Sequence, residues 1–263
     1  MHLRDRERQK AARRNVMSPD IIICDWNGTL IEYPDERPVL ENTARDVFRA
    51  SFPFHPFRMA RIFRARKELE ELYNRGRSNA ETDFIRALFR VYNERIIEGM
   101  PVSVILRSVE RYACKRQTQA RLEYRVLGPI RKCHQIGKIT GIFSAGYRYG
   151  IERILAFAGY TECFDFIEAD KLKVNRGEAI GFGLDIYKRK PELLRRLLKD
   201  KNMDASKVAY LGDSEDDEGC FETVGYPVVA FLAKDKLKQK FAQKYKAFVP
   251  KDEKELADFL SGK

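Results

Sequence analysis

The chain has 263 residues, of which 44% are hydrophobic and 34% charged, so it has enough apolar content to fold around a core. No uncharged apolar run approaches the roughly 18 residues that a membrane span needs, and we expect a soluble protein without a membrane partner. The formal net charge of +11 favours anionic ligands, but basic and acidic residues alternate and no nucleic-acid-binding motif accompanies them, which argues against a nucleic-acid partner.

Cysteine usage and the first residues of the chain bear on localisation. The five cysteines form neither C-x-x-C pairs nor histidine-paired zinc spacings, so we expect free thiols in a reducing cytoplasm: Cys24, Cys114, Cys133, Cys163 and Cys220. Residues 1–17 are basic and lack the apolar stretch of a secretory signal. We expect them to form a disordered tail outside the fold.

Short apolar runs separated by helical patterns predict the main fold. Strands are expected at 21–24, 138–143, 208–212 and 228–232, with a further candidate at 247–249. Helical periodicity is found at 147–159, 191–201 and 234–245. Strands that alternate with helices indicate an α/β fold with a doubly wound, mostly parallel sheet. We assign this core to residues 18–33 and 126–263.

Residues 34–125 show a different pattern. Three stretches of this segment repeat apolar residues at helical spacing, and none alternates as a strand does: FRMARIFRARKELEELYNRG, ETDFIRALFRVYNERIIEG and SVILRSVERYAC. Glycine, asparagine and proline between them mark turns. We predict an all-helical domain that is inserted between the first two strands of the core.

Polar residues that can carry chemistry lie at the ends of the predicted strands. The first strand is followed by Asp25-Trp26-Asn27-Gly28-Thr29-Leu30 and the second by Ser144-Ala145-Gly146. Lys190 precedes the third strand, which runs into Gly212-Asp213-Ser214-Glu215-Asp216-Asp217. In a doubly wound sheet, ligands bind beyond the carboxyl ends of the strands, so we expect these groups to meet at one edge.

These four groups, in this order, resemble the motifs of the haloacid dehalogenase superfamily: D-x-D-x-T, a Ser or Thr, a Lys, and G-D-x-x-x-D. The resemblance extends over about residues 20 to 260, firmly at the motifs and in outline elsewhere. The helical insertion after the first motif is similar to the cap of the phosphoserine-phosphatase-like branch. The resemblance implies a Rossmann-like core, a helical cap at 34–125 and a small phosphorylated substrate.

A role for each motif follows from the same resemblance. Asp25 is the expected nucleophile, because a carboxylate can form an aspartyl-phosphate that divides one difficult step into two easier ones. A hard cation, Mg²⁺, is expected on oxygen ligands from Asp25, Asp213, Asp217 and the backbone carbonyl of Asn27. Asp217 and its neighbour Asp216 either orient metal-bound water or hold the lysine. The phosphate oxygens are expected to contact Asn27, Gly28, Ser144, Ala145, Gly146 and Lys190.

Four lysines compete for the third motif. Lys171 and Lys173 lie nearer to the second motif, and Lys188 is two residues from Lys190. We choose Lys190 because it directly precedes Pro191, a residue that suits the first turn of the leucine-rich helix and would set the lysine at the start of that helix.

The sequence departs from the family pattern at Asn27, which stands where the phosphatases have a second Asp. That Asp protonates the leaving group and then activates water, whereas a neutral Asn cannot exchange a proton near pH 7. We therefore expect a slow phosphomonoester hydrolase, unless Glu32 or Asp35 substitutes. The alternatives are a catalytically impaired protein that binds a phosphorylated ligand or partner, and a metal-independent dehalogenase, against which the acidic cluster at Asp213 argues. No residue pattern predicts the substrate or the oligomeric state.

Overall fold

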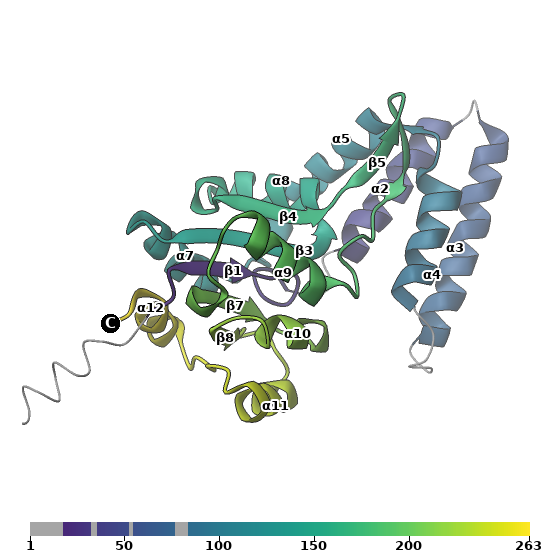
Figure 1. Cartoon of the computed structure of the whole chain (residues 1–263). Coiled ribbons are helices and arrows are strands. Elements are labelled where there is room, and N and C mark those ends of the chain that lie inside the picture. Colours follow the sequence, from purple (N-terminus) through teal and green to yellow (C-terminus); the bar gives the residue numbers. More distant parts are fainter. Residues whose placement is uncertain (1–17, 33–35, 53–54, 77–83) are drawn as a thin grey trace, which may run out of the picture.

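The computed structural model describes residues 18–32, 36–52, 55–76 and 84–263 (Figure 1). A parallel sheet of five strands forms the core, in the order β4-β3-β1-β7-β8. The strands are β1 (Ile21–Cys24), β3 (Ile139–Tyr147), β4 (Phe166–Asp170), β7 (Val208–Gly212) and β8 (Tyr226–Val229). Ile21 pairs with Ile139 on one side and with Val208 on the other, so β1 is the central strand. The expected parallel α/β sheet is confirmed.

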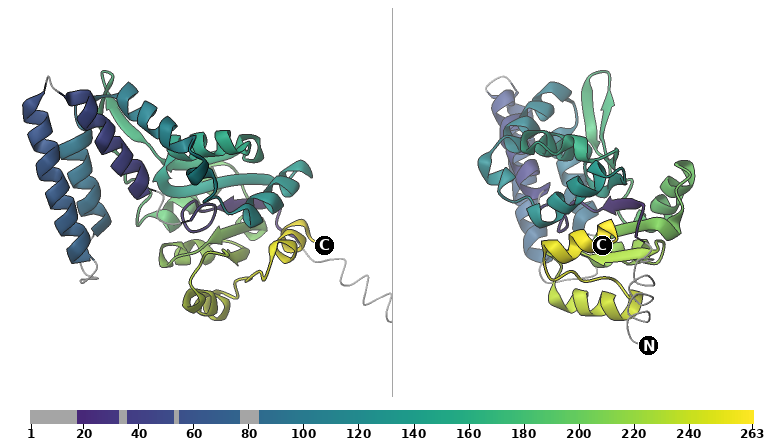
Figure 2. Two further views of the ribbon diagram at one scale, coloured as in Figure 1. Left: turned by 180° about the vertical axis from the view of Figure 1, so that it is seen from behind. Right: turned by 90° about the vertical axis from the view of Figure 1, so that its left-hand side faces the viewer.

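Helices cover both faces of this sheet (Figure 2). They are α7 (Tyr124–Gln135), α8 (Arg148–Ala158), α9 (Lys190–Asp200), α10 (Glu218–Phe221), α11 (Asp235–Tyr245) and α12 (Glu253–Ser261). Single-turn helices η2 (Thr161–Cys163), η3 (Ala205–Lys207) and η4 (Glu215–Asp217) join some of the elements.

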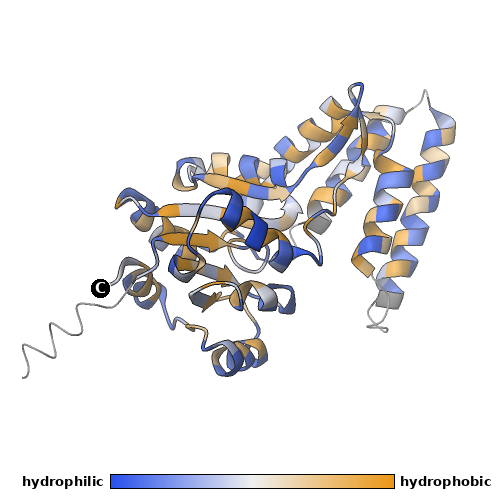
Figure 3. Ribbon diagram, viewed as in Figure 1, coloured by the Kyte–Doolittle hydropathy of each residue, from blue (hydrophilic) through white to orange (hydrophobic). Residues whose placement is uncertain are grey.

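The alternation of side chains along β1 explains the two faces. Ile22 and Cys24 pack with residues of α7, α8 and α12, whereas Ile21 and Ile23 pack with residues of α9, α10 and α11. Successive strand residues point to opposite faces, so a strand that is covered on both sides needs an unbroken apolar run. Strand β1 is accordingly hydrophobic along its length (Figure 3).

Two parts of the core differ from the prediction. Strand β3 continues to Tyr147, so residues 144–146 belong to a strand and not to a loop. The predicted strand at 247–249 makes only an isolated bridge between Val228 and Phe248. The fifth strand is instead β4, which was not predicted because its sequence, FIEAD, mixes apolar and acidic residues.

The described residues between β1 and α7 are mostly helical. The helices are α2 (Glu36–Ser51), α3 (Pro56–Gly76), α4 (Phe84–Val91), the π-helix η1 (Tyr92–Ile97), α5 (Val102–Ala113) and α6 (Arg116–Gln119). A separate hydrophobic cluster holds α2, α3, α4 and η1 together. Within the described ranges, no helix is long and apolar enough to cross a membrane.

A short strand in this segment departs from the all-helical prediction. Strand β2 (Met100–Pro101) pairs with β6 (Glu178–Phe182), which pairs in turn with β5 (Leu172–Asn175) in a three-stranded antiparallel sheet. Two residues are too few for a period-2 pattern to appear in a sequence. The β5–β6 hairpin, which follows β4 in the chain, is thus joined to the helical segment.

Hydrogen bonds from the Asn93 side chain and from the backbone strengthen this junction. The Asn93 side chain donates to the Phe182 carbonyl at 2.9 Å and accepts from the Phe182 amide at 2.8 Å. The Gly99 amide donates to the Ala179 carbonyl at 2.9 Å. The helical segment is therefore fixed to the hairpin as well as continuous with the core through its two ends.

Candidate active site

The turn after β1 carries the first predicted motif. The Asp25 amide donates to the Leu211 carbonyl at 2.9 Å, so this residue still follows the line of the central strand. The chain then turns back, because the amides of residues 30 and 31 both donate to the Trp26 carbonyl. Gly28 has a φ of +69°, and a Cβ there would lie 2.1 Å from Oδ2 of Asp213. Glycine therefore lets the backbone of the turn approach that carboxylate.

Lys190 lies between two buried carboxylates. Its Nζ is 2.8 Å from Oδ2 of Asp25 and 2.8 Å from Oδ1 of Asp217, and the three side chains are at most 7% exposed. Lys190 begins α9, with Pro191 in the first turn. Burial opposes the charge of the lysine, but the two carboxylates outweigh burial and raise the pKa of Lys190 above its usual value.

The other candidate lysines lie elsewhere. Lys188 and Lys171 are exposed, and Lys173 forms an exposed ion pair with Asp185 at 3.2 Å. Of the four candidates, the structure brings only Lys190 to Asp25.

Asp217 has a dense set of donors. Its Oδ1 accepts hydrogen bonds from Lys190 at 2.8 Å and from the Tyr210 hydroxyl at 2.9 Å. Its Oδ2 accepts from the Asp213 amide at 3.0 Å, the Ser214 amide at 3.2 Å and the Ser214 hydroxyl at 3.1 Å. Although burial raises the pKa of Asp217, Lys190 and these donors lower it overall. Asp217 is therefore an anion that fixes both Lys190 and the loop carrying Asp213.

Asp25, Asp213 and Asp217 together form an acidic cluster, in which one oxygen of each lies within 4.8 Å of the others. Among the described residues, Oδ1 of Asp25 is buried and has no hydrogen-bond partner. Burial raises the pKa of Asp25, and burial followed by repulsion from Asp217 and Asp25 raises the pKa of Asp213 to about 8. One lysine thus only partly neutralises three carboxylates, and a divalent cation on carboxylate oxygens would complete the neutralisation.

The second predicted motif lies beside the first at the same edge of the sheet. Ser144 is buried near the end of β3, which pairs with β1, and its hydroxyl favours the charged form of Asp25. The Gly146 amide donates to the Ser144 hydroxyl at 3.1 Å, and Ala145 between them is half-buried. Asn27 is half-buried in the turn after β1. The predicted site residues therefore lie where the strands β1, β3 and β7 end, and Lys190 reaches them from the start of α9.

Two further residues at this edge were not predicted. Tyr210 belongs to the apolar run of β7. Its hydroxyl, on the face of the strand that packs against α9 and α10, is the only feature of the sequence that could have indicated a role in the site. Asp170 ends β4 and is 5% exposed; its Oδ1 accepts from the amides of Asp185 and Ile186 at 2.8 and 3.1 Å. Burial raises the pKa of Asp170 to about 6. It anchors the segment that leads to Lys190.

The acids considered as substitutes for the missing Asp are not found in the cluster. Glu32 is exposed on the chain beyond the turn. Asp35 lies outside the described residues.

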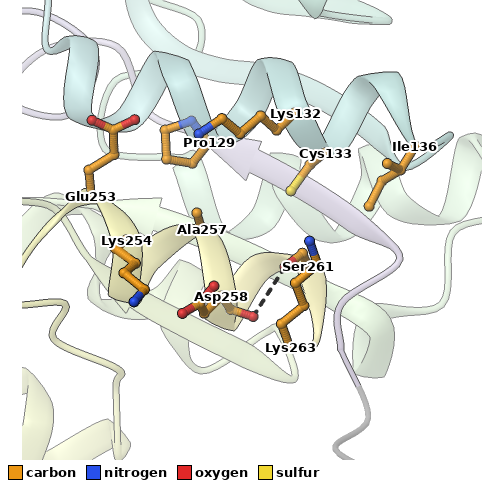
Figure 4. A pocket seen from close by; sticks show the side chains of 10 residues that line it. All are labelled: Pro129, Lys132, Cys133, Ile136, Glu253, Lys254, Ala257, Asp258, Ser261 and Lys263. Carbon is orange, nitrogen blue, oxygen red and sulfur yellow. Dashed lines mark hydrogen bonds between the residues drawn. The ribbon is translucent and has the colours of Figure 1, made fainter.

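A hollow of about 390 Å³ lies away from this site. It lies between α7 and α12 and contains none of the predicted site residues (Figure 4). Its lining combines apolar and oppositely charged side chains: Pro129, Lys132, Cys133, Ile136, Glu253, Lys254, Ala257, Asp258, Ser261 and Lys263. Volume alone therefore does not locate the chemistry of this protein.

Comparison with known proteins agrees with this arrangement of fold and motifs. The family model of the haloacid dehalogenase-like hydrolases matches residues 22–222, which include the entire candidate site. The chain belongs to this family. No curated protein matches the sequence.

Solved structures share the fold at low sequence identity. A phospho-aspartyl intermediate analogue of phosphoserine phosphatase is 17% identical with a TM-score of 0.54, and the match covers 88% of this chain and 92% of that one. Cytosolic 5'-nucleotidase IIIB bound to cytidine is 16% identical with a TM-score of 0.61, covering 97% and 90%. Phosphoserine phosphatase from T. onnurineus is 18% identical with a TM-score of 0.50, covering 94% and 96%.

Proposed function

We propose that this protein is a magnesium-dependent phosphomonoester hydrolase that acts through an aspartyl-phosphate on Asp25. The observation that carries the proposal is the state of the Asp25 carboxylate: Lys190 holds one oxygen at 2.8 Å, and the other is buried without a hydrogen-bond partner among the described residues. Such a group is fixed in position and keeps one oxygen for a ligand or an electrophile.

The residues around Asp25 fit a magnesium ion. Asp25 and Asp213 would supply carboxylate oxygens and Asn27 a backbone carbonyl, a donor set that magnesium prefers. The close approach of Gly28 to Asp213 supports this assignment, because it brings the turn against the second carboxylate. We assign Asp217 to holding Lys190 and not to the ion, because both of its carboxylate oxygens already accept hydrogen bonds. The bound ion would neutralise the repulsion between a carboxylate and a phosphate dianion.

The remaining motif residues would bind the phosphoryl group. Lys190 and the Ser144 hydroxyl, together with backbone amides of the turn and of residues 145–146, are the donors at this edge of the sheet. Because phosphoryl transfer depends mainly on positioning and electrostatics, such a set supplies most of what the reaction requires.

The reaction has two steps at phosphorus. An oxygen of Asp25 attacks, a bond forms between Asp25 and phosphorus, and the bond to the leaving alkoxide breaks. Water then attacks the aspartyl-phosphate, which releases inorganic phosphate and regenerates the carboxylate. Asn27 cannot donate a proton to the alkoxide or take one from water, so both protons must be exchanged with solvent. We therefore propose slow turnover of esters with poor leaving groups.

We propose that the helical segment between β1 and α7 is the cap that closes over this site. Val39 and Leu40 of α2 and Phe89 of α4 line a narrow pocket together with Trp26 of the turn. The side chains of the segment thus meet the turn that carries the nucleophile.

The test is the initial rate of p-nitrophenyl phosphate hydrolysis with magnesium and with a chelator. Its leaving group departs without a proton, so Asn27 penalises this substrate least. Asp25→Asn, which keeps the size of the side chain, should abolish the magnesium-dependent rate. A rate that persists in Asp25→Asn or in chelator would contradict the proposal.

Asn27 also favours a second candidate, a member of the family that binds a phosphorylated ligand without turning it over. In that case, vanadate with magnesium would raise the melting temperature while no phosphate is released. The variant Asn27→Asp separates the two candidates. If Asn27 only slows the enzyme, the variant should hydrolyse alkyl phosphates roughly 100- to 10,000-fold faster, because general acid-base catalysis contributes that much.

A further inference from the structure

An exposed group of aromatic side chains lies where α2 turns into α3. The two helices meet at the outer end of the helical segment, away from the core sheet (Figures 1 and 2). Phe52 is 61% exposed, Phe57 91% and Phe63 60%, and Phe57 is the most exposed large hydrophobic residue in the part of the chain that the structure describes. We call this region, residues 45–52 and 55–67, the α2–α3 tip.

Aromatic and basic side chains share the solvent side of α3. Phe57 and Arg64 are seven residues apart and Phe63 and Lys67 four, spacings that place the members of each pair on the same side of a helix. All four side chains are exposed. The Phe63 ring also contacts the ring of Phe48 in α2, 5.4 Å away and edge to face, so the two helices lie side by side at the tip.

The tip is basic. Residues 47–67 contain six Arg or Lys and no Asp or Glu, although acids and bases alternate in most of the chain. Arg58 and Arg61 donate to backbone carbonyls of residues 99 and 98 in the same segment, whereas Arg64 and Lys67 are exposed beside the aromatic rings. A second copy of the chain would bring like charges together here, so the tip favours an anionic partner.

A lipid bilayer fits this tip better than a folded partner does. The exposed rings lie on a protruding turn of the chain, so a rigid partner would need a groove of matching shape, whereas the headgroup region of a bilayer adapts around them (Figure 1). Aromatic side chains of interfacial helices enter this region, and Arg and Lys beside them attract anionic lipids. The tip offers both kinds of side chain together.

We propose that the α2–α3 tip docks on an anionic lipid bilayer, with Phe52, Phe57 and Phe63 in the headgroup region and Arg64 and Lys67 beside the lipid phosphates. The contact is peripheral, so it needs no apolar run long enough to span a bilayer and is compatible with the absence of such a run in the sequence. No residue of the candidate active site takes part, and the inference does not depend on the proposed phosphatase function.

The first test is flotation of the full chain with vesicles of phosphatidylcholine, alone or with about 30% phosphatidylglycerol. We expect binding to the anionic vesicles only, and at least about tenfold weaker binding when the salt concentration rises from about 0.05 to about 0.5 M, because salt screens the attraction. Phe57→Ser and Phe63→Ser should each lower the partition coefficient about tenfold, since each removes a large apolar side chain from the contact. The control Phe157→Ser, in α8 and 47% exposed, should bind as the original chain does.

A pair of double variants separates the local charge from the net charge. Arg64→Glu with Lys67→Glu should abolish binding to the anionic vesicles. Lys199→Glu with Lys236→Glu changes the net charge equally at exposed positions of α9 and α11, outside the tip, and should retain most of the binding. Circular dichroism shows whether each variant keeps the fold.

A fluorescent reporter shows which part of the chain enters the bilayer. Trp26 is the one tryptophan of the chain and is buried, so a tryptophan introduced in Phe57→Trp reports on the tip. Its emission should shift to the blue with anionic vesicles and be quenched by brominated lipid. The control Phe157→Trp should show neither change.

Each outcome decides the proposal. Absence of binding to anionic vesicles, binding that the tip variants retain, or a Phe57→Trp emission that brominated lipid does not quench would overturn it. Dimers in sedimentation equilibrium that Phe57→Ser abolishes, without vesicle binding, would also overturn it and assign the tip to a second copy of the chain. Binding of single-stranded RNA that depends on the tip, again without vesicle binding, would overturn it in favour of a nucleic-acid partner.

Discussion

Replacing Lys190 by Met removes the only cation that contacts Asp25 and Asp217 among the described residues. Methionine keeps much of the volume, so the change is mainly in charge. Both partners are at most 7% exposed and each lies 2.8 Å from the ammonium group, so little solvent can replace it. Breaking a buried ion pair on one side costs about 3–5 kcal/mol. We expect a loss of that size in the free energy of unfolding at pH 8 without divalent cations.

The assay is urea unfolding at pH 8 and at pH 5, with and without magnesium. At pH 5 the loss should be smaller, because the carboxylates left behind can take up protons. Magnesium should restore part of the stability at pH 8. The control is Lys188→Met, two residues away and exposed, which should change stability by less than about 0.5 kcal/mol. A loss below about 1 kcal/mol at pH 8, or one that does not depend on pH, would refute the buried charge triad as described.

Three further predictions concern other parts of the site and fold. Without divalent cations, the free energy of unfolding should fall as the pH rises from about 4 to 8. The pKa of Asp213 is raised to about 8 in the folded protein, so folded Asp213 keeps a proton that the unfolded chain releases. Thermal or urea titrations should show that magnesium weakens this pH dependence. Gly28→Ala would set a Cβ 2.1 Å from the Asp213 carboxylate at a φ of +69°, so magnesium-dependent hydrolysis should fall roughly 100-fold while overall helix content, measured by circular dichroism, is unchanged. Asn93→Ala should lower the free energy of unfolding by about 1–3 kcal/mol, because the amide and carbonyl of Phe182 lose their partner; a urea midpoint equal to that of the original protein would contradict this.

The sequence was most informative where one pattern had one structural meaning. The apolar runs at 21–24 and 208–212 became β1 and β7 with the predicted bounds, because strands covered on both faces must be apolar throughout. Lys190 was found at the start of its helix because Pro191 marks a first turn. Parallel strands bring their carboxyl ends to one edge, and this rule predicted that the groups after β1, β3 and β7 lie close together.

Elements that depend on distant partners could not be read from the sequence. Strand β2 is formed only because the hairpin lies beside it, and β4 carries acidic residues that local patterns assign to a loop. The role of Tyr210 in the site likewise depends on the hydrogen bond that its hydroxyl donates to Asp217, across the turn after β7. The assignment of Asp217 as a metal ligand or as a support for Lys190 also required the geometry of its donors, which spacing does not reveal.

The union of β2 with the β5–β6 hairpin has a mechanical consequence. Phe182, at the end of β6, is clamped by Asn93 of the helical segment, and only seven residues separate it from Lys190. A displacement of the helical segment would therefore act on residues 183–189, which connect β6 to the lysine. Asp170 opposes such a displacement, because it accepts hydrogen bonds from the amides of Asp185 and Ile186 near the middle of this connection. The position of the helical segment and the placement of Lys190 beside Asp25 are thus linked through one short connection, which Asp170 fixes near its middle.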